Sequence, residues 1–546
     1  MYHEHSRKAF VLAAAALTLL LLVNACGAAE APTPTKAPAV AASPTPAATP
    51  TPVLPKKGGT LRYIHQSNPL AMDVLQTISS ADTTYMAPIY DGFIMVEPDR
   101  SFSPAQARSW DVLDGGKTIV LHIAPGIKFH DGTPFNAAAV KSDFDYKLNP
   151  DNQFEQRPQM TVISSVEAIG EYDLKLNLKQ TDALVMPNMG ARAGWVFSPT
   201  ARDAVAKADR KMKPVGAGSF KFVDILIDSH LTMERWPNGF GGGKYPYVDT
   251  LKYLFIADPA VQLATYRAGE VDAYQAYNDQ LPTLRADKTT VLVPRWRTEW
   301  GFLMVNPRFK PLDDVRVRKA MSLAIDREAI VKAFLAGEGT ALYGVIGAAW
   351  SWCYDPTYKK YGFNPEEAKK LLTEAGYSQG FKVSPTTWFG KESRLPLLNL
   401  LADQMKQVGI TLDLVMMESI QASRQFSFDK TLAAYSSEWG TGAPDLHTHM
   451  GDLFDSTNPR YMFGQGYLDA AVVKQLDEAL AKGRGTLEPK DRCGYYRQAQ
   501  EIINDYMLGI SLFTGRVSMA HRDYVKNYQE FPSGGGSQWF KVWLDK

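Results

Sequence analysis

The chain has 546 residues, with 59 Lys and Arg against 58 Asp and Glu, and a formal net charge of +1 at pH 7. This near-neutral balance argues against nucleic acid or an anionic membrane surface as the main partner, because both attract strongly basic proteins. The length exceeds what one hydrophobic core usually serves, so we expect two lobes.

The N-terminus predicts a secretory signal. Two basic residues precede an apolar run of 16 residues, Phe10 to Ala25, which is short for a membrane-spanning helix and typical of a signal peptide. The run ends at Val23-Asn24-Ala25-Cys26-Gly27, which resembles a bacterial lipobox. In that reading residues 1–26 are a lipoprotein signal peptide, and a diacylglycerol on Cys26 anchors the mature chain to the cell membrane. The alternative is an ordinary signal peptide or an uncleaved anchor in which Cys26 has no such role.

Residues 27–56 consist mostly of Ala, Pro, Thr and Ser. With so few large apolar side chains, this stretch cannot offset the entropy cost of ordering. Repeated prolines favour an extended, semi-rigid conformation. We therefore expect a tether that holds the folded domain away from the membrane.

The remaining chain alternates strand and helix patterns. Asn136, Asp326 and Asn364 each stand where a helix is expected to begin, and the last is followed by Pro365 at the first helical position. The apolar residues between 317 and 325 recur at helical spacing and predict one buried face. Helices that alternate with strands predict α/β lobes.

Four blocks, in order, are similar to the family 5 extracellular solute-binding proteins, which serve ABC importers of peptides and nickel. They are Pro125 to Phe135, Val215 to Asp272, Asp314 to Ile330, and Tyr496 to Phe513. The resemblance implies a periplasmic-binding-protein-like fold of two α/β lobes, with a hinge and a ligand cleft between them. Residues 57–295 and 511–546 would form the first lobe, and residues 296–510 the second.

The same resemblance implies the function. The protein would be an extracytoplasmic, monomeric receptor without cofactor or catalysis, which delivers an oligopeptide-like solute to the transmembrane permease. Receptors of nickel or other metal chelates, or of oligosaccharides, are alternatives on the same fold. From other classes, an enzyme or a signalling receptor on this fold stays open, although common catalytic and phosphate-binding motifs are missing from the sequence.

Several residues are candidates for ligand contact. Asp445 corresponds to an acid of the family's peptide receptors, but the usual earlier acid is replaced here, which puts capture of an α-amino group in doubt. Arg394 or Lys391 could bind a ligand carboxylate, or could be a solvated loop charge. Trp388 and Trp439 offer aromatic faces, although each could equally belong to the core.

His447 resembles the metal-side histidine of nickel-type receptors, and His449 follows two residues later. A metal complex is therefore a weak alternative ligand, because two histidines need further ligands and a histidine pair in a loop more often forms hydrogen bonds. Cys353 and Cys493 are the cysteines that follow Cys26. They could pair as a disulfide in an oxidising compartment or remain two isolated thiols, and two cysteines do not make a zinc site.

Overall fold

The structure is a computed structural model that describes residues 54–77, 79, 82–388, 394–440, 445–458, 467–529 and 539–546. The chain divides into Met1–Leu54 and a compact unit, Pro55–Lys546. Cys26, its lipobox and nearly all of the predicted tether lie outside the described residues, as does Lys391. In the part of the chain that is described, no helix has the length and apolar character needed to cross a bilayer.

The first lobe contains a sheet with helices packed on it and a separate four-stranded antiparallel sheet, ordered β4-β5-β7-β6. Its elements are β1 (Thr60–His65), α1 (Thr83–Tyr90), β2 (Ile94–Val96), β3 (Phe102–Pro104), β4 (Ala107–Leu113), β5 (Thr118–Ile123), α2 (Ala137–Leu148), β6 (Ile163–Ala168), β7 (Asp173–Leu178), α3 (Val185–Met189), α4 (Pro199–Ala204), α5 (Lys207–Arg210), β8 (Phe220–Leu226), β9 (His230–Arg235), β10 (Thr250–Phe255), α6 (Pro259–Arg267), β11 (Ala273–Ala276), α7 (Leu281–Ala286), β18 (Val525–Lys526) and β19 (Trp543–Leu544).

The second lobe surrounds strands β14, β15 and β16 with helices. Its elements, together with the two strands it shares with the first lobe, are β12 (Thr290–Val305), α8 (Val315–Leu323), α9 (Arg327–Phe334), β13 (Gly339–Ala341), α10 (Pro365–Glu374), β14 (Phe381–Trp388), α11 (Leu395–Lys406), β15 (Ile410–Leu414), α12 (Ser419–Arg424), β16 (Ala434–Trp439), α13 (Leu446–Phe454), α14 (Ala470–Gly485), α15 (Pro489–Asp505) and β17 (Ile510–Arg522). The α/β class expected from the sequence is confirmed.

Local sequence explains several helix starts. The side chain of Asn136 accepts a hydrogen bond from the amide of Ala139 at the start of α2. Asp326 caps α9 and Asn364 caps α10 in the same way. These bonds satisfy amides that have no partner inside the helix.

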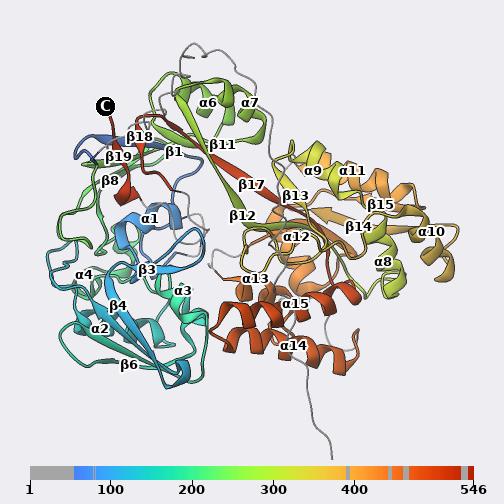
Figure 1. Cartoon of the computed structure of the whole chain (residues 1–546), viewed down its shortest axis with the longest axis horizontal. Helices are drawn as coiled ribbons and strands as arrows, with labels where there is room; N and C mark the ends of the chain where they lie inside the picture. The colour runs from blue at the N-terminus through green and yellow to red at the C-terminus, as the bar shows by residue number, and fades with distance from the viewer. Residues whose placement is uncertain are drawn as a thin grey trace, which may run out of the picture. The chain divides into compact units, whose positions relative to one another are not determined.

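Strands β12 and β17 connect the two lobes. They pair antiparallel from Thr290 opposite Arg522 to Leu303 opposite Ile510, with an irregularity between Trp296 and Trp300. Figure 1 shows the two long strands, green and red, running side by side from one lobe into the other. The chain therefore enters and leaves the second lobe through one two-stranded connection, and both expected lobe boundaries lie within it.

Almost all the residues of each hydrophobic core belong to one lobe, as the expected boundaries define the lobes. The core of the first lobe combines residues 61–273 with residues 519–544. The cores of the second lobe use residues between 300 and 513. Leu512 and Phe513, expected to return to the first lobe, instead pack in the second, because the inner end of β17 lies beside β12 and β13 there.

Candidate functional site

A cluster of charges lies where β12 passes between the lobes. The Oε2 atom of Glu438, at the end of β16, lies 3.3 Å from a guanidinium nitrogen of Arg297 and 3.3 Å from one of Arg394. Glu299 lies 3.5 Å from Arg297 on the same strand. Burial would raise the pKa of Glu299, but the positive charges of Arg297 and Arg295 outweigh it and hold that pKa below its usual value. The cluster therefore presents both signs of charge, and the carboxylate of Glu299 is held ionised.

Strand pairing assembles this cluster from distant parts of the sequence. Glu438 stands opposite Gly301 in the β12–β16 ladder, which brings it within reach of Arg297. Arg394 stands immediately before α11. The side chain of Arg394 is mostly buried, and its Nη1 atom has no hydrogen-bond partner among the described residues. A buried guanidinium nitrogen without a partner is costly, so a ligand acceptor there would be favoured.

The two predicted tryptophans differ in accessibility. Trp439, the last residue of β16, is half-buried at the edge of a core of the second lobe. Trp388 is the last residue of β14 and is 3% exposed. Strand β14 extends as far as Trp388 because Thr386, Thr387 and Trp388 pair with β16.

Asp445 has two partners within the protein. Its Oδ1 atom accepts a hydrogen bond from the amide of His447 at the start of α13. Both its carboxylate oxygens also accept from Nη2 of Arg492 on α15, at 2.8 and 2.9 Å. Asp445 therefore joins α13 to α15, and its charge is already compensated.

His447 and His449 lie on α13 and not in a loop, which corrects our expectation, because Asp445 caps the start of this helix. The ring of His449 lies 4.2 Å from that of Trp300, whereas His447 packs against Tyr496. Burial lowers the pKa of His447 to about 4 and that of His449 to about 3. Residues at this spacing point to different sides of a helix, so the two rings do not converge on one metal ion.

A cavity of about 390 Å³ opens beside Asp445 and Arg492. Its walls come from both lobes: residues 99–119 and 182–187 from the first, and Trp352 with residues 487–492 from the second. Two contacts between the lobes flank it. Arg100 donates to the carbonyl of Ala349 and lies 4.4 Å from the ring centre of Trp350. Arg484 pairs with Asp182 at 2.7 Å.

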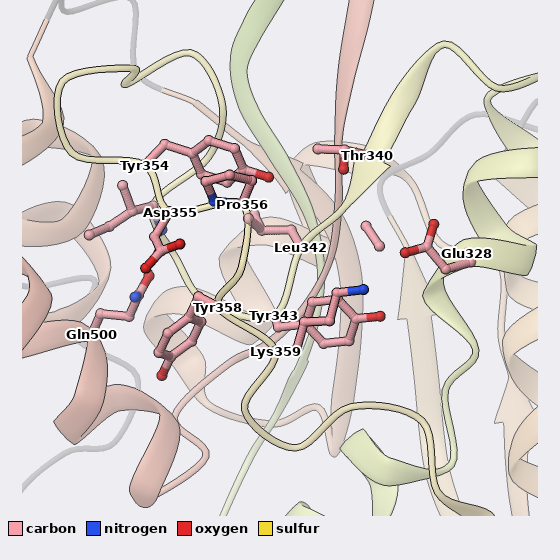
Figure 2. A pocket seen from close by; sticks show the side chains of 13 residues that line it. Glu328, Thr340, Leu342, Tyr343, Tyr354, Asp355, Pro356, Tyr358, Lys359 and Gln500 are labelled. Atoms are coloured by element: carbon pink, nitrogen blue, oxygen red, sulfur yellow. The ribbon is translucent and has the colours of Figure 1, made fainter. Parts of the chain in front are cut away.

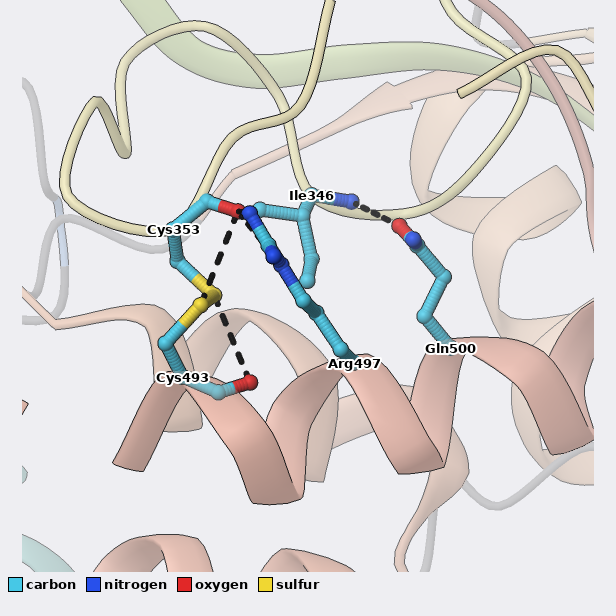
Figure 3. Close-up of a disulfide and its surroundings, with 5 residues drawn as sticks. All are labelled: Ile346, Cys353, Cys493, Arg497 and Gln500. Carbon is cyan, nitrogen blue, oxygen red and sulfur yellow. Dashed lines mark hydrogen bonds between the residues drawn. A yellow bond between two sulfur atoms is a disulfide. The ribbon is translucent and has the colours of Figure 1, made fainter. Parts of the chain in front are cut away.

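Cys353 and Cys493 form a disulfide in the structure, with an S–S distance of 2.21 Å. As Figure 3 shows, further bonds fasten the same loop to α15: Arg497 donates to the carbonyl of Cys353, and Gln500 accepts from the amide of Ile346. The fastened segment carries Trp350 and Trp352. The disulfide therefore holds part of the cavity wall in place.

A smaller pocket of about 100 Å³ lies within the second lobe (Figure 2). Glu328 of α9, Lys359 and Tyr343 of the following loops, and Gln500 of α15 are among the side chains that line it. Among the described residues that line it there is no predicted ligand residue, and all of them belong to one lobe, so it does not fit a site that closes around a ligand.

Sequence reasoning missed Arg100, Arg297 and Arg492. Nothing in their local sequence marks them, because each reaches the site through sheet order or helix packing. The sequence alone leaves Glu438, the neighbour of Trp439, open as either a ligand contact or a solvated acid. The local sequence does not show that the fold places Arg297 and Arg394 beside the carboxylate of Glu438.

The family model for bacterial extracellular solute-binding proteins, family 5, matches residues 101–461. The glutathione-binding protein GsiB of Shigella flexneri serotype 5b is 26% identical over 477 residues, covering 86% of this chain and 92% of that protein. The oligopeptide-binding protein AppA of Bacillus subtilis, solved with a nonapeptide, has a TM-score of 0.73 at 23% identity, covering 90% of this chain and 100% of that one. NikA of Brucella suis, solved with Fe(III)-EDTA, has a TM-score of 0.79 at 17% identity, covering 89% and 100%. At these identities the two solved structures show a shared fold.

Proposed function

Because the chain belongs to the bacterial extracellular solute-binding proteins of family 5, we propose that it is the receptor of an ABC importer for an oligopeptide-like solute. The solute would bind between the lobes and favour their closed arrangement, which the permease would then recognise. The receptor would act as a monomer and without chemistry of its own.

The observation that carries the ligand class is the cluster of Glu438, Arg297 and Arg394 at the lobe connection. A peptide carries an ammonium group at one end and a carboxylate at the other, so it can pair with both signs of charge. Arginine suits the carboxylate because its planar fork forms two charge-assisted hydrogen bonds. Glutathione, the ligand named for GsiB, is itself a modified tripeptide.

The first test is native mass spectrometry of the purified protein, followed by calorimetric titration with tripeptides. We expect saturable binding that weakens at least tenfold in Glu438→Gln, since the variant lacks the negative charge of the cluster that would pair with the peptide's ammonium group. Glu366→Gln, an exposed substitution on α10, is the matched control and should leave the affinity unchanged. A co-purified hexose oligomer or metal chelate, with no tripeptide binding, would contradict the peptide assignment.

We also propose that Cys26 carries a lipid and that residues 27–56 are the tether between membrane and receptor. The lipobox-like segment and the low-complexity composition support this. Cells grown with labelled palmitate should incorporate the label into the wild-type protein but not into Cys26→Ser. Equal labelling of the two proteins would refute the anchor.

A further inference from the structure

Three large apolar side chains that are unusually exposed for their type line the same cavity between the lobes. They are Phe102, 37% exposed, Val112, 43% exposed, and Leu487, 45% exposed. The first two belong to the first lobe and the third to the second. Apolar side chains that gather around one concave space mark a binding site more clearly than single exposed ones do.

The remaining apolar wall suits a flat or bulky group. It includes Trp110 and Ile119 of the first lobe, Met186 of α3, and Trp352 of the second lobe. Tryptophan offers a large face for aromatic contacts, and methionine adapts its shape and contacts aromatic rings favourably. The volume of about 390 Å³ falls within the range of small-molecule sites.

The charged side chains in this wall already have partners within the protein. Asp445 binds Arg492, and Asp182 binds Arg484. Asp99 accepts hydrogen bonds from the amide and hydroxyl of Ser101. Arg100, which also lines the cavity, donates to the carbonyl of Ala349 and lies 4.4 Å from the ring centre of Trp350. Because all these side chains are engaged within the protein, what the cavity offers a ligand is mainly its apolar surface.

We infer that this cavity is a subsite for an apolar, preferably aromatic, side group of the captured solute. The inference rests on the proposed function and makes it more specific: the preferred peptide would carry such a side chain, placed beside Trp110 and Trp352. Both lobes supply walls, so a group that fills the cavity is fully desolvated only when they are together. Occupation therefore stabilises the closed arrangement.

The test uses 5-fluoroindole as a probe of the cavity alone, with binding to the full-length protein followed by fluorine NMR. Val112→Trp fills the cavity from the first lobe and Leu487→Trp from the second. Val223→Trp, on β8, is the matched control, because Val223 is 50% exposed and lies outside the cavity lining. We expect at least fivefold weaker binding in both cavity variants and unchanged binding in the control. The two cavity variants come from different lobes, so a folding defect in one leaves the other informative.

No saturable binding of 5-fluoroindole to the wild type, or equal binding in all four proteins, would overturn the subsite. A parallel titration compares Gly-Trp-Gly with Gly-Gly-Gly, for which we expect at least a tenfold preference for the former in the wild type. If both peptides bind equally and the probe does not respond to the cavity variants, the subsite fails while the peptide receptor stands. If the probe responds as expected but neither peptide binds, the subsite stands and the proposed ligand class fails.

Discussion

At the scale of single residues, the buried histidines give the protein an acid sensitivity. The ring of His449 lies between Trp300 and Trp350, and burial lowers its pKa to about 3, although the nearby charge of Glu299 acts in the opposite direction. The unfolded chain binds the proton more readily, near pH 6.5. The stability contributed by the neutral ring is therefore complete above pH 6.5 and is lost as the pH falls toward the folded pKa, by about 2 kcal/mol at pH 5.

We expect His449→Gln to reduce this loss. Urea unfolding at pH 7.5, 6.0 and 5.0 measures the slope of unfolding free energy against pH, which should be shallower in the variant whatever its absolute stability. His122→Gln is a contrasting variant, because hydrogen bonds to Asp173 and Asp111 raise the pKa of His122. Removing this histidine should make the unfolding free energy fall more steeply as the pH is lowered. Identical slopes in His449→Gln and wild type would contradict the assignment.

Residue-level prediction from sequence succeeded where the determining contacts were local. Asn136, Asp326 and Asn364 cap helices because each side chain accepts a hydrogen bond from a backbone amide only three residues later. The cluster of Glu438, Arg297 and Arg394 depends instead on which strands pair, and nothing in its local sequence carries that information. That Asp445 contacts the ligand stays a prediction, and its pairing with Arg492 gives it a structural role as well.

At the scale of elements, the disulfide fastens the loop after β13 to α15. Its cysteines are 140 residues apart, so the cross-link restricts the unfolded chain considerably. The loss of chain entropy predicts that the disulfide adds about 4–5 kcal/mol to the free energy of unfolding. We expect the double variant Cys353→Ser, Cys493→Ser to unfold at a markedly lower denaturant concentration.

Treatment of the wild type with a reductant should reproduce this loss, whereas the same treatment should leave the double variant unchanged. The variant should also bind 5-fluoroindole more weakly, because Trp352 lies one residue from Cys353 and lines the cavity. An unfolding midpoint equal to that of the wild type would show that the cross-link adds no stability.

At the scale of the whole molecule, the ion pair of Asp182 and Arg484 joins the two lobes at 2.7 Å. The side chain of Asp182 is almost fully buried, whereas that of Arg484 is partly exposed. Solvent therefore screens the ion pair, and we expect it to stabilise the contact between the lobes by about 1 kcal/mol. Arg484→Gln should therefore shift the lobes toward an open arrangement and weaken ligand binding roughly fivefold.

Small-angle X-ray scattering of the ligand-free protein should show a larger radius of gyration for Arg484→Gln than for wild type. Lys482→Gln removes an exposed positive charge from the same end of α14 and should change neither the radius nor the affinity. If both substitutions act alike, the effect belongs to net charge and not to the contact between the lobes.

The two-stranded connection also has a consequence for the order in which the chain assembles during synthesis and export. The second lobe is an insertion whose ends are neighbours, since Trp296 pairs with Arg516, and among the described residues its cores use none beyond Phe513. The first lobe begins earlier but needs Met519, Trp539 and Phe540 from the end of the chain. The lobe that starts first is therefore completed last, and any truncation of the final 30 or so residues should damage this first lobe while sparing the inserted one.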